Sequence, residues 1–395
     1  MTGKIAALSV WASACLLALP CAAAPAPAAW QATGSSSTDS ATWPHVLEDL
    51  RLYGDLRLRQ ESSFDLGSNP DRHRQVMRLR LGANYRIDQR TEVGARMVTG
   101  DPTDPNSTHV TLGDGFEGFG LSLDRAYLTY RPETWTDSEV RGGKFSHPFY
   151  RNEVYGELLW DADVQPEGVL ARKSFKDLTL VDSVDATLGV YALQEQRAAN
   201  DAALIAAEVT SSARLSSDWR SRFALAYYGY TSVEPGGSTE LLDENRGNAT
   251  VDDDMDGSPD RFVSDYGILD LNAGFTFEGL SSPLILSTEF LHNARADERG
   301  DGFAAGVSYG SHAVPGDWLL YYQYQRIEQD SVFSAFAQDD FLLATNHQSH
   351  LLGVNYQLSD GVGLVLWGLV SDPLESNPGD PTSPWRIRFD LNVKF

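Results

Sequence analysis

The feature that most constrains the fold is a period of two in the polar and apolar residues. Between residues 74 and 87, apolar side chains alternate with arginine and asparagine: Met77, Leu79, Leu81, Ala83, Tyr85 and Ile87 stand against Arg74, Arg78, Arg80, Asn84 and Arg86. A strand directs alternate residues to opposite faces, whereas a helix would scatter these arginines around its axis. The segment 49–61 repeats the pattern. We therefore predict strands that are apolar on one face.

The same pattern recurs along the chain and predicts an all-β protein. Most of the segments have about eleven residues, which is near the length that crosses a bilayer as a tilted strand. We expect a closed antiparallel transmembrane β-barrel of about 16 strands, within a range of 14–18. The predicted spans are 49–61, 74–87, 91–100, 121–131, 137–145, 167–175, 183–195, 202–215, 219–232, 262–277, 283–293, 302–311, 316–327, 347–358, 361–371 and 385–395.

The connections between these segments alternate in length. Short connections such as 88–90, 216–218 and 359–360 follow the even-numbered strands, and long ones such as 101–120 and 233–261 follow most odd-numbered strands. Short periplasmic turns and long extracellular loops are typical of outer-membrane barrels. A soluble β-sandwich has no reason to separate its loops in this way.

The first residues predict export. Lys4 precedes an apolar run over 5–20 and small residues over 22–29, the three parts of a secretory signal peptide. We expect a cleaved signal peptide at 1–28, a disordered periplasmic leader at 29–48 and the barrel domain at 49–395. Both cysteines, Cys15 and Cys21, would leave with the signal. The expected location is the outer membrane of a Gram-negative bacterium, among its lipids and lipopolysaccharide.

The last strand also indicates an outer-membrane barrel. Its apolar residues share one face, and the chain stops on an aromatic residue: Trp385, Ile387, Phe389, Leu391, Val393 and Phe395. We expect Phe395 to be an assembly signal for the barrel-assembly machinery.

Net charge is unevenly distributed. The chain carries a formal charge of −24, and the predicted long loops hold 30 acidic and 7 basic residues, a net charge of −23. This acidity excludes nucleic acid as a partner, because a phosphate backbone rewards clustered positive charge. The barrel wall is close to neutral.

Arginines gather in the first four predicted strands. Arginine at mid-depth on a lipid-facing surface costs about 2–4 kcal/mol, so most of these side chains should face the lumen. There they either favour anion passage or pair with lumen acids such as Asp55, Glu92 and Asp124 and stiffen the wall; we favour a mixture of both roles. The lumen-lining candidates are Arg57, Arg59, Arg78, Arg80, Arg96 and Arg125.

The third long loop, 146–166, is a candidate constriction. It contains Glu153, Glu157, Asp161 and Asp163. If the loop folds into the barrel, these acids would face the arginines and create a transverse electric field.

The longest loop carries a candidate calcium site. Asp252, Asp254, Asp256 and Asp260, with Gly257, match the spacing of a short calcium loop. Val263 stands where an EF-hand has its bidentate Glu. The alternative is a solvated acidic loop. No other cofactor is expected.

Several blocks resemble the bacterial "putative porin" family of outer-membrane β-barrels. They are segments 54–59, 78–84, 121–130, 143–149 and 159–168, and the match is dense over about 50–170. The resemblance implies a passive channel. We therefore expect a porin with a water-filled lumen for diffusion of small hydrophilic solutes, and no enzyme. The alternatives are a specific channel for an anionic solute or polyuronate, and a surface structural or adhesin barrel. Monomer and homotrimer both stay open.

Overall fold

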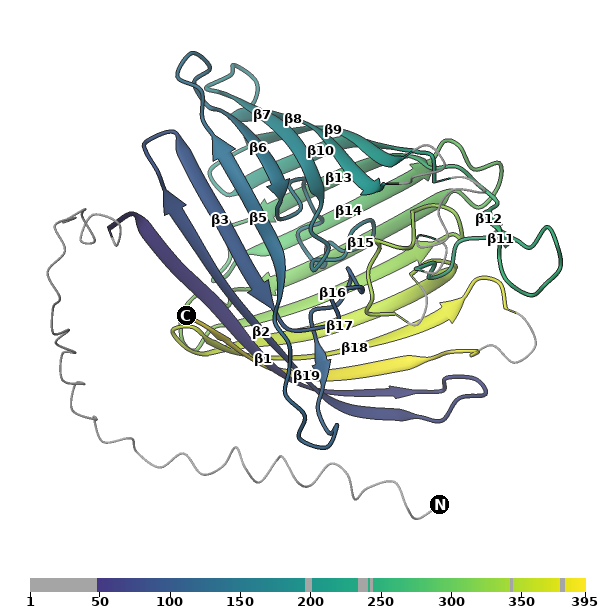
Figure 1. The fold of residues 1–395 in the computed structure, drawn as a ribbon. Coiled ribbons are helices and arrows are strands. Elements are labelled where there is room, and N and C mark those ends of the chain that lie inside the picture. The colour runs from purple at the N-terminus through teal and green to yellow at the C-terminus, as the bar shows by residue number, and fades with distance from the viewer. Residues whose placement is uncertain (1–47, 196–200, 234–240, 242–243, 342–343, 377–380) are drawn as a thin grey trace, which may run out of the picture. The chain divides into compact units, whose positions relative to one another are not determined.

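The computed structural model contains one large antiparallel β-sheet (Figure 1). It describes residues 48–195, 201–233, 241, 244–341, 344–376 and 381–395, so the expected signal peptide and most of the leader lie outside the described residues. No helix in the described ranges is long and apolar enough to cross a membrane. Sixteen long strands form the wall: β1 (Leu50–Phe64), β2 (Arg72–Arg86), β3 (Thr91–Val98), β5 (Ser122–Tyr130), β6 (Ser138–Lys144), β7 (Glu167–Lys176), β8 (Ser183–Gln194), β9 (Ala202–Arg214), β10 (Trp219–Thr231), β13 (Gly267–Phe277), β14 (Leu284–Asn293), β15 (Asp301–Gly310), β16 (Trp318–Ile327), β17 (His347–Ser359), β18 (Val362–Pro373) and β19 (Trp385–Lys394).

The sheet closes on itself because the first strand pairs with the last. β1 and β19 are antiparallel from Asp55 opposite Lys394 to Phe64 opposite Trp385. Beyond β19, the backbone N–H of Phe395 donates to the carbonyl oxygen of Gly54, and the Gly54 N–H donates back to the carbonyl oxygen of Phe395. The Phe395 ring lies over Gly54, where an added Cβ would come within 2.6 Å of it. Closure removes the exposed sheet edges, as a barrel in lipid requires.

The predicted alternation becomes an outer and an inner surface. On β8, Leu188 and Val190 point outward and are about half exposed, whereas Tyr191 points inward and is buried. Burial alternates in the same way along β9 and β13. The predicted closed antiparallel barrel of sixteen strands is therefore confirmed.

The predicted strand boundaries need one sizeable correction. The span 262–277 is divided into the two-residue strand β12 (Arg261–Phe262) and the wall strand β13, separated by the segment 263–266. β12 pairs with β11 (Thr250–Val251) as a small hairpin within the long loop between β10 and β13. Another two-residue strand, β4 (Val110–Thr111), lies midway along the 99–121 connection and pairs with β2. A search for period-two alternation does not reveal these short strands, because two residues are too few to show the pattern.

Long loops fold into the barrel and pack against the wall. The loop 145–166 contributes Phe149, Leu158 and Trp160 to a buried cluster with inward residues of β7–β10. The loop 328–346 adds Val332, Phe333 and Ala335, all fully buried. The rings of Trp160 and Phe336 stack at 5.5 Å and so join the two loops. The wall residues of this core come from β7–β10 and β13–β16, whereas the candidate arginines stand on β1, β2, β3 and β5.

Candidate functional site

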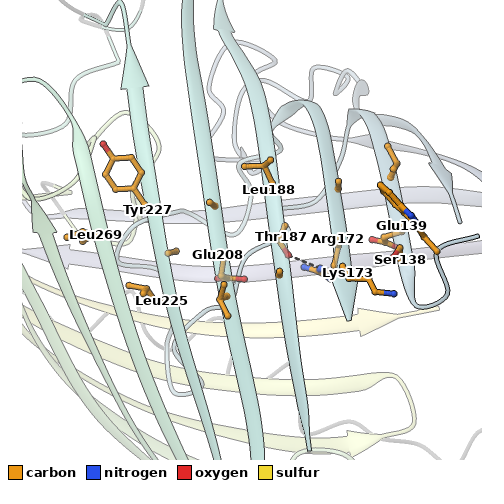
Figure 2. A pocket seen from close by; sticks show the side chains of 17 residues that line it. Ser138, Glu139, Arg172, Lys173, Thr187, Leu188, Glu208, Leu225, Tyr227 and Leu269 are labelled. Carbon is orange, nitrogen blue, oxygen red and sulfur yellow. Dashed lines mark hydrogen bonds between the residues drawn. The ribbon is translucent and has the colours of Figure 1, made fainter. Parts of the chain in front are cut away.

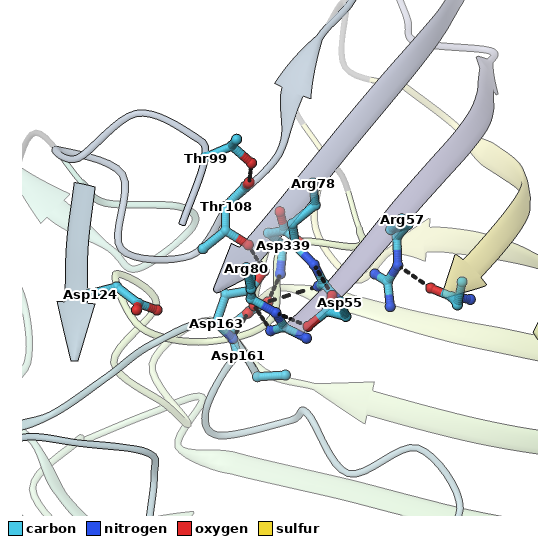
Figure 3. Close-up of polar contacts among 12 residues, drawn as sticks. Asp55, Arg57, Arg78, Arg80, Thr99, Thr108, Asp124, Asp161, Asp163 and Asp339 are labelled. Carbon is cyan, nitrogen blue, oxygen red and sulfur yellow. Dashed lines mark hydrogen bonds and ion pairs between the residues drawn. The ribbon is translucent and has the colours of Figure 1, made fainter. Parts of the chain in front are cut away.

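The arginine-rich strands line one side of the interior. Asp55 of β1 lies between two arginines of β2, with Arg78 Nη2 2.9 Å and Arg80 Nε 2.6 Å from its two carboxylate oxygens (Figure 3). In the register of β1 and β2, Asp55 pairs with Arg80, and Arg57 pairs with Arg78. Asp55 and Arg57 are two residues apart, so alternation directs both side chains to the same face of β1. Arg96 of β3 binds Asp124, which lies at a register shift in β5. Part of the candidate set is therefore tied to wall carboxylates.

Inward residues of β19 complete this wall, although none of them is among the candidate lumen-lining residues predicted from the sequence. Arg59 makes a two-pronged contact with Asp390, with Nε 2.7 Å and Nη2 2.8 Å from the carboxylate oxygens. Arg388 contacts Glu61 of β1 and Asp340 of the inward loop 328–346. Arg386, Arg388 and Asp390 alternate with the apolar residues of the terminal strand, so their inward direction could have been predicted from the sequence.

Two of the candidate arginines are poorly compensated. Arg57 stands directly opposite Arg78, and its Nε donates to the neutral Asn392 at 2.7 Å, while Asp390 lies 3.6 Å away. Arg125 stands opposite Arg96 and donates to the neutral Gln165 at 2.7 Å. Like charges directly opposite each other destabilise a sheet. These two like-charged pairs leave positive charge facing the lumen.

One of the four candidate acids in loop 146–166 contacts the arginine-rich wall. Asp163 Oδ1 lies 3.2 Å from Arg80 Nη1 and 3.7 Å from Arg78 Nη1 (Figure 3). Its other oxygen accepts a hydrogen bond from Thr108 Oγ1 at 3.1 Å. Asp163 therefore links the loop, the wall and the 99–121 connection.

The other three acids have different surroundings. Asp161 accepts a hydrogen bond from the backbone N–H of Asp339, so it binds the second inward loop. Glu153 reaches across to Arg222 of β10, with 3.3 Å between Oε1 and Nη1. Glu157 is half-buried. Of the four loop acids expected to face the arginines across the lumen, Asp163 is the one in direct contact with them.

Charge around these loop acids changes their proton affinity. Burial alone would raise the pKa of Asp163, but Arg78 and Arg80 outweigh it and hold that pKa below its usual range. Burial raises the pKa of Glu157 to about 7, against the opposing effect of Arg151. Burial, Asp339 and Glu157 raise the pKa of Asp161 well above its usual range. The packed loop therefore favours protonated Glu157 and Asp161.

This linkage predicts that loop packing depends on pH. A carboxyl group whose pKa rises to about 7 on packing stabilises the packed state fully below its ordinary pKa, and this contribution is lost as pH rises through 7. We expect amides of 150–165 to exchange hydrogen more slowly at pH 5.5 than at pH 8, after correction for intrinsic rates. Glu157→Gln should reduce the difference, whereas Glu298→Gln in the 294–300 loop should leave it unchanged. Equal protection at both pH values would contradict the prediction.

The predicted calcium ligands lie in the loop that β11 and β12 close. Carboxylate oxygens of Asp252, Asp254 and Asp260 lie within 4.8 Å of one another. Asp256 is outside this group, and its carboxylate accepts a hydrogen bond from the Ser258 N–H at 2.8 Å. Gly257 has a φ of +95°, a conformation that favours glycine. The loop brings together three of the four predicted ligands.

A closed barrel with an apolar exterior, charged interior and inward loops defines the class of transmembrane β-barrel channels. A protein-family model described as "Putative porin" matches residues 66–265 and 269–395. The chain belongs to the putative porin family, and it is an outer-membrane channel protein. The predicted resemblance is confirmed, and it extends well beyond the region 50–170. No curated protein matches the sequence significantly.

Solved porin structures share the fold at low sequence identity. OprB of Pseudomonas putida is similar with a TM-score of 0.58 and 12% identity, covering 88% of this chain and 95% of that chain. OmpF of Salmonella typhi, solved with daunomycin, gives 0.52 and 10%, covering 88% and 97%. The trimer form of OmpT, an outer membrane protein of Vibrio cholerae, gives 0.50 and 13%, covering 88% and 99%. At these identities the likeness shows the fold alone.

Proposed function

We propose that this porin passes small hydrophilic anions in preference to cations. The observation that carries the proposal is the pair of poorly compensated arginines, Arg57 and Arg125, each placed opposite another arginine. A positive wall raises the local concentration of anions in a narrow aqueous passage. Among the loop acids, Asp163 reaches this side of the wall and contacts Arg78 and Arg80, whereas Arg57 and Arg125 donate to the neutral Asn392 and Gln165.

Planar-bilayer recording tests both the channel and its preference. Purified barrel should give discrete conductance steps, and in a KCl gradient the reversal potential should move toward that of chloride. A reversal potential of zero, or one shifted toward the equilibrium potential of potassium, would overturn the anion preference while leaving the porin function intact. Absence of steps would instead favour a surface structural or adhesin barrel.

A specific channel for an anionic solute or polyuronate is the second candidate. It is favoured by the spacing of the arginines along the four adjacent strands β1, β2, β3 and β5, which suits a chain of carboxylates. Reduction of single-channel conductance by oligouronate at concentrations that leave neutral oligosaccharide without effect would support it. Equal block by both sugars would favour general diffusion.

We also propose that the 252–260 loop binds calcium, a function that the convergence of Asp252, Asp254 and Asp260 supports. Calorimetric titration of the full-length barrel should show calcium binding that Asp254→Asn together with Asp260→Asn weakens at least about tenfold. Asp297→Asn with Glu298→Gln, in a separate acidic loop, is the matched control. Unchanged heats in the loop variant would show a solvated acidic loop.

Export and assembly complete the proposal. We propose that residues 1–28 are cleaved as a signal peptide and that Phe395 directs assembly by the barrel-assembly machinery. N-terminal sequencing of the mature protein tests the first proposal. Comparison of the outer-membrane yields of Phe395→Ala and Phe389→Ala tests the second.

We further propose a homotrimer embedded among outer-membrane lipids and lipopolysaccharide, as the trimer form of the similar OmpT suggests.

A further inference from the structure

Three buried carboxylates face the interior on strands that carry none of the candidate arginines. Glu208 of β9, Asp270 of β13 and Glu289 of β14 are 5%, 3% and 4% exposed. Each stands on the buried side of a strand whose residues alternate between buried and exposed. Glu208 and Asp270 both pair with Ala226 of β10, one from each side. An ionised carboxylate is costly to enclose unless positive charge or a proton compensates it.

Two of these acids form a compact patch with an asparagine. Asp270 and Asn272 are two residues apart on β13 and so share its inward face, and Glu289 stands directly opposite Asn272 on β14. The Asn272 Nδ2 donates a hydrogen bond to Asp270 Oδ1 at 2.7 Å. Side chains at diagonal positions on one face of a sheet lie within reach of each other. We call Asp270, Asn272 and Glu289 the acid triangle.

No protein cation compensates these carboxylates. In the part of the chain that the structure describes, Glu208, Asp270 and Glu289 form no ion pair with Lys, Arg or His. Arginines on neighbouring elements bind other groups. Arg172 of β7 donates to Thr187 Oγ1 at 3.1 Å (Figure 2), Arg222 of β10 pairs with Glu153, and Arg151 donates to the carbonyl oxygen of Asp161. The interior here therefore holds negative groups without a positive partner from the described chain.

The acid triangle also contains oxygen atoms that lack a hydrogen-bond partner. Among the described residues, nothing donates to Asn272 Oδ1 or to Glu289 Oε2, although both atoms are buried. The hydroxyl of the fully buried Tyr228 is likewise unpaired, and Tyr228 pairs with Ile268, two residues before Asp270 on the same face. An amide oxygen and a carboxylate oxygen only accept hydrogen bonds. One cation can satisfy both, whereas a proton on Glu289 would leave Asn272 Oδ1 dependent on a single donor.

The inward loop 145–166 covers this part of the wall. The backbone N–H of Tyr150 donates to Glu208 Oε2 at 2.7 Å, and that of Glu153 donates at 3.4 Å to Oγ of Ser287, which is two residues from Glu289 on the same face. Val154 packs on Gly306 of β15, where an added Cβ would lie 2.9 Å from its side chain. A group bound in the acid triangle would therefore lie between the wall and the loop.

We propose that Ca²⁺ binds in the acid triangle and fastens loop 145–166 to the wall. Carboxylate and amide oxygens are the ligands that Ca²⁺ takes in proteins, and water completes its coordination. The carboxylates of Asp270 and Glu289 together balance its charge. The site is separate from the 252–260 loop, in which three acids converge, and it does not depend on the ion preference of the channel.

Terbium luminescence tests the site, because Tb³⁺ takes the oxygen ligands of Ca²⁺ and a nearby tyrosine such as Tyr228 sensitises its emission. The parent is the full-length barrel with Asp254→Asn and Asp260→Asn, which removes binding in the 252–260 loop. It should bind Tb³⁺ that Ca²⁺ displaces. Asp270→Asn and Glu289→Gln, added singly, should each weaken binding at least about tenfold. Asp185→Asn, an acid of β8 outside the triangle, is the matched control and should bind as the parent does. A parent that binds no Ca²⁺, or equal binding in all variants, would overturn the proposal.

Hydrogen exchange tests whether the ion holds the loop. In the same parent, amides of 150–154 should exchange more slowly with Ca²⁺ than with a calcium chelator, and Glu289→Gln should abolish the difference while Asp185→Asn keeps it. Equal exchange with and without Ca²⁺ in the parent would show that the ion does not fasten the loop and would overturn that part of the proposal. Heat-modifiable migration on gels establishes that each variant is a folded barrel. Conductance steps are recorded on the same samples, so loss of the calcium site is distinguished from loss of the porin function.

Discussion

Replacement of Arg57 and Arg125 by Gln should remove the anion preference of the channel. Each guanidinium binds a neutral amide, Asn392 or Gln165, and stands opposite another arginine. A unit charge acts on an ion about 4 Å away with about 1 kcal/mol in water, so each arginine accounts for at most about a fivefold change in relative permeability. The reversal potential in a KCl gradient measures this ratio directly.

Stability should change little in the same double variant, since each substitution removes repulsion between like charges as well as one hydrogen bond to a neutral group. Arg57→Gln also removes the 3.6 Å contact with Asp390, but Asp390 keeps its closer contact with Arg59. Arg90→Gln is the matched control, because Arg90 lies in the turn 87–90 and pairs with the exposed Glu133. A selectivity change no larger than that of Arg90→Gln would show that the wall arginines are structural.

Local alternation made the barrel predictable from sequence. A strand that faces lipid on one side and the interior on the other must alternate, and every second residue of β2 from Met77 to Tyr85 is apolar. The inward direction of Arg57, Arg78 and Arg125 follows from the same rule. Their pairing does not, because it depends on register: a shift of one residue would bring each arginine opposite a different partner.

Contacts between the inward loops and distant wall strands could not be predicted. Asp163 meets Arg80 across 83 positions of sequence, and Arg388 meets Asp340 across 48. A signal for the second inward loop was nevertheless present, since Val332, Phe333, Phe336 and Phe341 place large apolar side chains in a long loop. Apolar residues in a long loop indicate that it packs against something, but periodicity does not identify the surface.

Arg388 is the residue whose loss should destabilise the protein most. Its guanidinium contacts both Glu61 and Asp340 and lies 4.7 Å from the centre of the Trp367 ring. The side chains of Arg388 and Glu61 are 3% and 2% exposed. Replacing Arg388 by Met leaves two enclosed carboxylates without this cation, and breaking a buried ion pair from one side costs about 3–5 kcal/mol.

We expect Arg388→Met to lower the free energy of unfolding in denaturant titrations by an amount in this range. Because Asp340 belongs to the inward loop 328–346, the variant should also loosen that loop and raise single-channel conductance. The triple variant Glu61→Gln, Asp340→Asn and Arg388→Met removes the stranded charges together with the cation. It should recover most of the lost stability, because amides at both sites carry no charge that burial penalises. If the triple variant is as unstable as Arg388→Met, the loss comes from packing against Trp367 and the charge network is not what holds the loop.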